Sequence, residues 1–400
     1  MAEAMIGKMN INTEITKQHI GLRHILKNAE KHELAFQEIF NCSAACGGST
    51  FSKAVFRMPY FGIDECQTSD PPEPWMSTVC RMKDVFDYDI LAKLLDDPNF
   101  DTNIKTNYDD LVKFIEDKNQ HEVCLQKMCQ SKCSDGALVV TKTDIAYALA
   151  VHLFAPLSNL QKSCILDNHS EGFPKSCPGG CGRSVAKGTT GIGAAQTWHG
   201  YADISVNQTV PVKVLSEEPH DLSVDEEQLD QSDSEDSYDS ITATRTPFYQ
   251  RTDPISEVLA MTITNGFAQV NENNSLTNFL IPSIACSIED VMVFTYDSQN
   301  DLLACIPEHF RLWSRTDKHH FDISSIVRIW LYLNFRTFMR PSILESFVIE
   351  KSNFHKIAPL RHYQQYSKCG VIDFSSKDKT PRVRETQSAR KRRHSDDVSR

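Results

Sequence analysis

The sequence predicts a mixed α/β protein that begins with a helical unit. Apolar residues recur at helical spacing through much of the first 135 residues. The middle of the chain instead alternates apolar and polar residues over a short hairpin at 202–214. Further β-rich runs follow, separated from the hairpin by a helical stretch, and this mixture is typical of a sheet covered by helices.

The N-terminal unit is predicted from its apolar periodicity. Residues 13–40 carry apolar side chains at helical spacing after a cap at Asn12 or Thr13, and indicate one long helix or two shorter ones. A second amphipathic pattern covers 85–95 and ends before Pro98. One or two more helices are expected in 111–133. We therefore predict a helical domain over 1–135, in which nothing points to catalysis.

The second unit is predicted to span 136–345. Thr143 is a suitable cap for a helix over 145–154, which Pro156 closes or bends. The later elements are expected in this order: a short strand near 183–187, the hairpin, a helix over 254–270, strands at 279–288, 291–296 and 302–306, and a helix over 321–339 stopped by Pro341. Residues 346–400 form a C-terminal region that ends in a polar tail.

The hairpin is the best-defined element of the sequence. Its apolar residues share one face of two strands joined by a polar connection at 207–209. Counting outward from that connection places Asp203 opposite Lys213, with roughly 5 Å between their β-carbons. The simplest interpretation is an exposed cross-strand ion pair worth less than about 1 kcal/mol.

The net charge of −11 is concentrated in one segment. Residues 214–244 contain eleven acids and neither Lys nor Arg, so the rest of the chain is neutral overall. The charge total is therefore no argument against nucleic-acid binding and no argument for it. We expect 214–246 to be a disordered acidic loop, with serines suited to acid-directed kinases. The basic run Arg390–Arg393 fits either nuclear import or a solvated tail.

Thirteen cysteines, no signal peptide and no membrane-spanning apolar stretch predict an intracellular protein without disulfides. Cysteines at short spacing are then metal ligands or buried thiols. Cys164, His169, Cys177 and Cys181 form a candidate zinc set, because Pro178-Gly179-Gly180 between the last two allows a tight turn. Free buried thiols are the alternative. Cys124, Cys129 and Cys133 are interpreted as structural.

The order of elements around Gly200-Tyr201-Ala202-Asp203 and Val212-Lys213-Val214 resembles the PD-(D/E)xK nuclease superfamily, especially its phage-type exonuclease and RecB-like branches. The resemblance covers about residues 140 to 300. It implies a restriction-endonuclease-like core in which Asp203 binds Mg²⁺ or Mn²⁺ and Lys213 acts on the attacking water or the transition state. The family's second metal-binding acid is replaced by Pro211, and Glu217 or Glu218 is the expected substitute.

Two functions follow from these features. The first is a nuclease-like domain, degenerate or inactive, that binds DNA or RNA; an active form would be a metal-dependent nuclease. The second is a non-enzymatic intracellular interaction protein regulated by its phosphorylatable acidic loop. A carboxylate near Asp203 in a cleft lined by Lys or Arg would favour the enzyme, whereas an isolated Asp203 would favour the binding protein.

Overall fold

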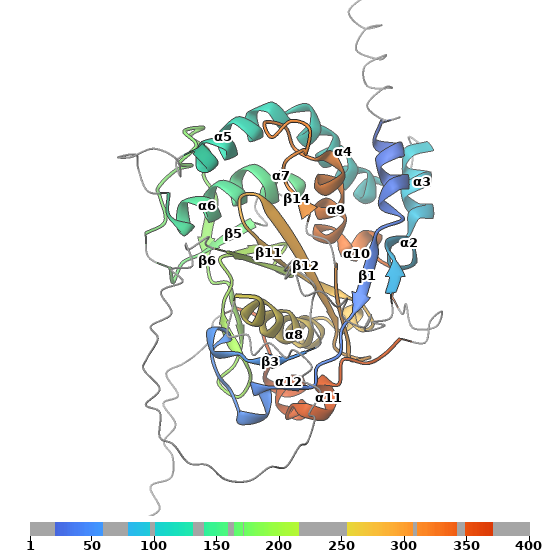
Figure 1. Ribbon diagram of the computed structural model, residues 1–400, viewed down its shortest axis with the longest axis vertical. Coiled ribbons are helices and arrows are strands. Elements are labelled where there is room, and N and C mark those ends of the chain that lie inside the picture. The colour runs from blue at the N-terminus through green and yellow to red at the C-terminus, as the bar shows by residue number, and fades with distance from the viewer. Residues whose placement is uncertain are drawn as a thin grey trace, which may run out of the picture.

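A ten-stranded mixed sheet lies at the centre of the molecule and confirms the α/β class (Figure 1). The computed structural model describes residues 21–58, 79–96, 101–130, 140–158, 164–170, 172–215, 254–306, 310–341 and 349–370. The acidic segment from residue 216 and the basic tail lie outside the described residues. The same holds for Cys133, Glu217 and Glu218.

The strands of the sheet come from most of the described chain. In spatial order they are β4 (Val79–Arg81), β1 (Glu33–Phe36), β13 (Leu302–Cys305), β12 (Asp290–Asp297), β11 (Ile281–Cys286), β10 (Val210–Val214), β9 (Ile204–Val206), β5 (Cys164–Asp167) and β6 (Ala186–Gly188), and β14 (Phe310–Arg311) pairs with β12. The pairs β10–β11 and β5–β6 are parallel, whereas the other paired neighbours are antiparallel. Two small sheets lie apart: β2 (Asn41–Cys42) with β3 (Phe56–Arg57), and β7 (Gly191–Gly193) with β8 (His199–Tyr201).

Helices cover the two faces of the sheet, and each face has its own buried core (Figure 1). One face is covered by α4 (Thr102–Glu116), α5 (Lys118–Gln130), α6 (Lys142–Leu149), α7 (Ala155–Leu157), α9 (Ile323–Leu333) and α10 (Phe335–Phe338), with α2 (Met82–Val85) and α3 (Tyr88–Asp96) beside them. The other face is covered by α8 (Pro254–Glu272), with α11 (Phe354–Ile357) and α12 (Leu360–Tyr366) beyond it. The short turns η1 (Ser43–Cys46) and η2 (Phe51–Lys53) lie on the α8 side, and η4 (Asn274–Leu276) follows α8. Burial of apolar side chains on both faces is what holds the three layers together.

The hairpin forms in the predicted register. Val206 pairs with Val210, Pro211 with Ser205, and Val212 with Ile204. Pairing of β10 with β11 begins at Val212, so Pro211, which has no N–H, lies just before that ladder. The predicted strands at 279–288, 291–296 and 302–306 and the helix from 254 are also confirmed.

The prediction of helix through residue 40 is wrong from residue 30. Residues 21–29 are helical, but the chain then enters β1, which pairs with β13 on one side and β4 on the other. The apolar residues Leu34 and Phe36 are buried within the sheet side of the core, so tertiary pairing decided a segment whose spacing suited a helix. The unit predicted to be helical, residues 1–135, therefore contributes strands β1 and β4 to the sheet. The domain boundary at 135 stays a prediction.

A π-helical turn interrupts the helix that begins at Lys142. The cap is Thr141 rather than Thr143, and its hydroxyl accepts the Asp144 backbone N–H in a capping box. Residues 142–149 are α-helical, and Ala150–Phe154 form the π turn η3 before α7 continues with Pro156. Such turns inside helices recur at functional sites. His152 lies at the middle of this one, fully buried.

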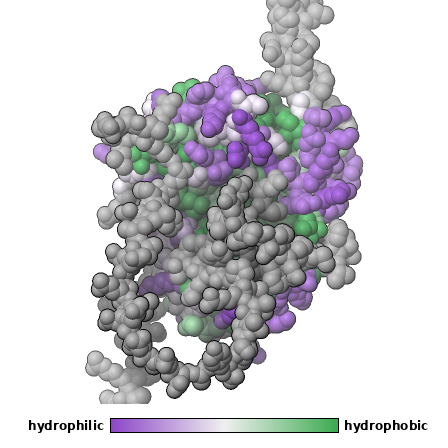
Figure 2. All heavy atoms as spheres, viewed as in Figure 1, coloured by the Kyte–Doolittle hydropathy of each residue, from purple (hydrophilic) through white to green (hydrophobic). Residues whose placement is uncertain are grey.

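The outer surface over α2 and α3 is mainly hydrophilic, as Figure 2 shows. Within the described ranges, no helix combines the length and apolar character needed to cross a bilayer.

Two side-chain amides of α8 hold the hairpin connection. Asn207 and Gln208 adopt positive φ values of 53° and 57°. Asn265 donates to the Thr209 carbonyl at 2.9 Å, and Gln269 donates to the Gln208 carbonyl at 2.9 Å. These bonds tie the turn to the helix that covers it.

We predict that Asn265→Ala lowers the free energy of unfolding by about 1 to 3 kcal/mol, because it leaves the buried Thr209 carbonyl without its donor. Asn274→Ala, which removes an exposed amide from η4, is the control and should change little. Denaturant unfolding of both variants tests this, and equal midpoints for the two would contradict it.

Candidate functional site

The carboxylate of Asp203 lies at the end of the sheet, immediately before β9. Its Oδ2 accepts the Val214 backbone N–H at 2.7 Å and lies 3.1 Å from Lys142 Nζ, which comes from the start of α6. The Asp203 side chain is 13% exposed. The backbone N–H of Asp203 donates to the Val212 carbonyl, so regular pairing ends at Ile204–Val212 and the predicted pairing of Asp203 with Lys213 does not form.

Lys213 forms its ion pair with Glu257 and not with Asp203. Its Nζ lies 2.5 Å from Glu257 Oε1 in the first turn of α8, and the two side chains are 14% and 21% exposed. The expected exposed cross-strand pair is therefore wrong, because α8 covers this face of the hairpin and supplies a closer carboxylate. Burial acts to lower the pKa of Lys213, but the negative charges of Asp203 and Glu257 outweigh it and raise that pKa.

These four side chains form a charge cluster of two acids and two lysines: Lys142, Asp203, Lys213 and Glu257. The structure thus joins two predicted residues, Asp203 and Lys213, with two that sequence reasoning missed. The available signal for Glu257 was an acid in the first turn of the helix that follows the hairpin. The third predicted residue, Glu217, lies outside the described residues.

A second group lies in the helical layer. Cys124 of α5, His152 of η3 and Cys181 offer ligand atoms that all lie within 4.8 Å of one another, so this group could hold a metal ion. Cys124 is buried, His152 is fully buried and Cys181 is half-buried. The Nε2 atom of His152 lies 3.3 Å from Cys181 Sγ and 3.2 Å from Cys177 Sγ.

The loop that carries these cysteines approaches α5 closely. A Cβ on Gly179 would lie 2.9 Å from the Cβ of Cys124, so the approach requires glycine. Gly180 has a φ of +79° and its N–H donates to the Cys177 carbonyl, which closes the turn. Lys127 Nζ donates to the Gly179 carbonyl at 2.7 Å from the same face of α5.

Two neighbouring histidines lie beside the cysteines, with their Nδ1 atoms in contact. His152 Nδ1 lies 3.1 Å from His121 Nδ1, and His121 stacks on Phe114. Burial lowers the pKa of each histidine to about 4, so both are neutral near pH 7. Neutral imidazole is the form of histidine that binds a metal. Burial raises the pKa of Cys177 to about 11, so this cysteine is a thiol until a bound cation displaces its proton.

Of the predicted metal set, Cys181 belongs to this group and Cys177 contacts its histidine, whereas Cys164 and His169 lie elsewhere. Cys164 is fully buried at the start of β5 with its thiol near the Ala150 carbonyl. His169 is held by Asp167 at 3.2 Å and stacks on Tyr201. Cys124, interpreted as structural, belongs to the group instead.

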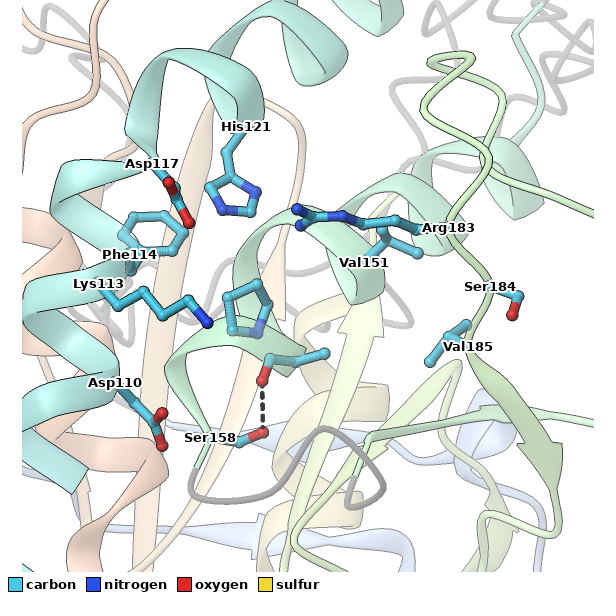
Figure 3. A pocket seen from close by; sticks show the side chains of 12 residues that line it. Asp110, Lys113, Phe114, Asp117, His121, Val151, Ser158, Arg183, Ser184 and Val185 are labelled. Carbon is cyan, nitrogen blue, oxygen red and sulfur yellow. Dashed lines mark hydrogen bonds between the residues drawn. The ribbon is translucent and has the colours of Figure 1, made fainter. Parts of the chain in front are cut away.

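An open pocket of about 510 Å³ has His121 in its lining (Figure 3). Lys113 of α4 and Asp117, which follows that helix, line one wall, and Arg183 lines the opposite wall with its guanidinium extended toward His121 (Figure 3). Arg183 donates to Gln120 at 2.9 Å. The pocket carries charges of both signs, since Asp110 also lines it.

No family model, curated protein or solved structure matches this chain.

We predict that Lys213→Met destabilises the protein by about 1 to 3 kcal/mol, because Glu257 would be left largely buried without its partner. Lys142→Met is the matched control: its side chain is 34% exposed, so the loss should stay below about 1 kcal/mol. The double variant Lys213→Met/Glu257→Leu should recover part of the loss. Equal thermal stability of Lys213→Met and wild type would refute the pairing.

Proposed function

We propose that this chain contains a restriction-endonuclease-like core whose nuclease site is inactive. The support for the core is the element order around the hairpin: α6 with its π turn, β5, β9 and β10 in antiparallel succession, α8, then β11 parallel to β10. This is the arrangement that the resemblance to the PD-(D/E)xK superfamily implies. Asp203 immediately precedes β9 and Lys213 lies on β10.

The balance of charge in the cluster is the observation that carries the inactive assignment. Lys142 neutralises Asp203 and Lys213 neutralises Glu257, so the four groups sum to zero. Mg²⁺ binds where carboxylates outnumber cations and keeps several waters. A hydrated divalent cation therefore gains no net electrostatic attraction here, and Pro211 supplies no third acid.

A metal-dependent nuclease is the second candidate, and Glu257 favours it. Its carboxylate reaches Lys213 from α8 and so lies at the hairpin where the family has its second acid. Displacement of Lys142 would then leave Asp203 and Glu257 to bind Mg²⁺ or Mn²⁺, with Lys213 positioned for the transition state. The active candidate requires the ion pair between Lys142 and Asp203 to open. The inactive assignment requires no change in the cluster.

An inactive core leaves binding as the role of the protein. DNA or RNA is the ligand that the nuclease-like fold suggests, while the neutral charge cluster adds no attraction for phosphates. The alternative is an intracellular or nuclear interaction protein regulated by the acidic segment. A strong dependence of binding on salt would favour nucleic acid over a protein partner.

We also propose that the ion held by Cys124, His152 and Cys181 is zinc with a structural role. Thiolate sulfur with imidazole nitrogen is the donor set of structural zinc sites, whereas Mg²⁺ and Ca²⁺ take oxygen ligands. The three residues come from α5, η3 and the loop before β6, so one ion would link three segments of the helical layer.

We predict no cleavage of linear or single-stranded DNA by the purified protein with Mg²⁺ or Mn²⁺, because the charge cluster is neutral. Asp203→Ala and Glu257→Gln serve as comparisons in the same gel assay. Cleavage by the wild type that both substitutions abolish would establish the second candidate in place of the first.

We predict one zinc per chain in protein purified without chelator, measured by elemental analysis. Removal of the metal under reducing conditions should lower the melting temperature, because binding to the folded state alone stabilises it. A metal-free protein with unchanged melting temperature would contradict the structural role.

A further inference from the structure

We propose that Cys177 is the fourth ligand of the metal group and that Cys124, His152, Cys177 and Cys181 form a closed Cys3His site. The inference rests on the proposed zinc and deepens it. It excludes a site that keeps a water-filled fourth position for catalysis.

Distances around His152 support the fourth ligand. In a tetrahedral zinc site with Zn–S of about 2.3 Å and Zn–N of about 2.0 Å, nitrogen and sulfur lie roughly 3.6 Å apart. His152 Nε2 is 3.2 Å from Cys177 Sγ and 3.3 Å from Cys181 Sγ. The same nitrogen therefore faces both thiols at nearly the length of a tetrahedral edge, and Cys177 is no farther from it than Cys181.

The loop that carries Cys177 and Cys181 is held by its own backbone hydrogen bonds. The Arg183 N–H donates to Cys181 Sγ at 3.4 Å, and the Gly180 N–H donates to the Cys177 carbonyl at 2.9 Å. A hydrogen bond from an N–H to sulfur stabilises the negative charge of a thiolate and orients it toward the ion.

Burial leaves little space for water as the fourth ligand. Cys177 is 4% exposed, Cys124 is 5% exposed and His152 is fully buried. The other predicted donors are engaged elsewhere, since His169 bonds to Asp167 and Cys164 faces Ala150. Outside the group of Cys124, His152 and Cys181, Cys177 is the described cysteine whose sulfur contacts His152 Nε2, and we assign it as the fourth donor on that contact.

The second histidine positions the first. When Nε2 of His152 binds the ion, its Nδ1 carries the proton and donates to His121 Nδ1, 3.1 Å away. His121 then accepts with Nδ1, and its stacking on Phe114 fixes the ring. A metal-binding imidazole held by a hydrogen bond from its other nitrogen is the general arrangement in protein metal sites.

Cobalt substitution tests the fourth ligand. The metal-free, reduced full-length protein is titrated with Co²⁺, and the sulfur-to-cobalt charge-transfer absorption is compared among the wild type, Cys177→Ser and Cys164→Ser. We expect tetrahedral cobalt bound by three thiolates in the wild type and in Cys164→Ser, and a loss of about one third of the charge-transfer intensity in Cys177→Ser. Equal intensity in Cys177→Ser and the wild type overturns the proposal while leaving zinc itself in place.

X-ray absorption of the zinc-loaded wild type gives an answer that needs no variant. Three sulfurs and one nitrogen around zinc support the closed site. Two sulfurs with two nitrogen or oxygen neighbours overturn it. A wild type that binds neither zinc nor cobalt overturns the zinc assignment, and the fourth ligand with it.

Discussion

The parallel pairing of β10 with β11 is the constraint on which the rest of this structure depends. Two parallel neighbours need a long crossover, which α8 supplies on one face of the sheet. The helix in turn places Glu257 over Lys213 at its first turn and Asn265 and Gln269 over the hairpin connection further along. A single helix thus sets both the charge cluster and the turn geometry.

The two polar sites of the molecule differ in what holds them together. The charge cluster joins residues of neighbouring elements, and its lysines already satisfy its acids. The cysteine group joins segments far apart in the sequence. Its thiol and imidazole groups point toward one another, and they carry no charges that pair with each other as the acids and lysines of the charge cluster do. A soft cation therefore finds a better site in the helical layer than a hard cation finds on the hairpin.

Local patterns predicted much of the fold and about half of each site. The hairpin followed from period-two alternation and a short polar connection, both of which are local. Cys177 and Cys181 followed from their spacing. Cys124 and His152 were missed because neither shares a helix with another member of the group. Cys124 was grouped with its sequence neighbours Cys129 and Cys133, and His152 lies in an apolar run whose ordinary interpretation is core. Residues 33–36 were misassigned because strand pairing with distant partners outweighed local spacing.

The acidic segment is inserted at a point where its two ends flank the charge cluster. It leaves the described chain after Leu215, next to the Val214 N–H that Asp203 accepts, and the chain is described again from Pro254, three residues before Glu257. Closing a longer connection costs only about 0.6 kcal/mol for each doubling of its length. The described ends of this connection, Leu215 and Pro254, are therefore fixed close to Asp203 and Glu257, whatever the length of chain between them.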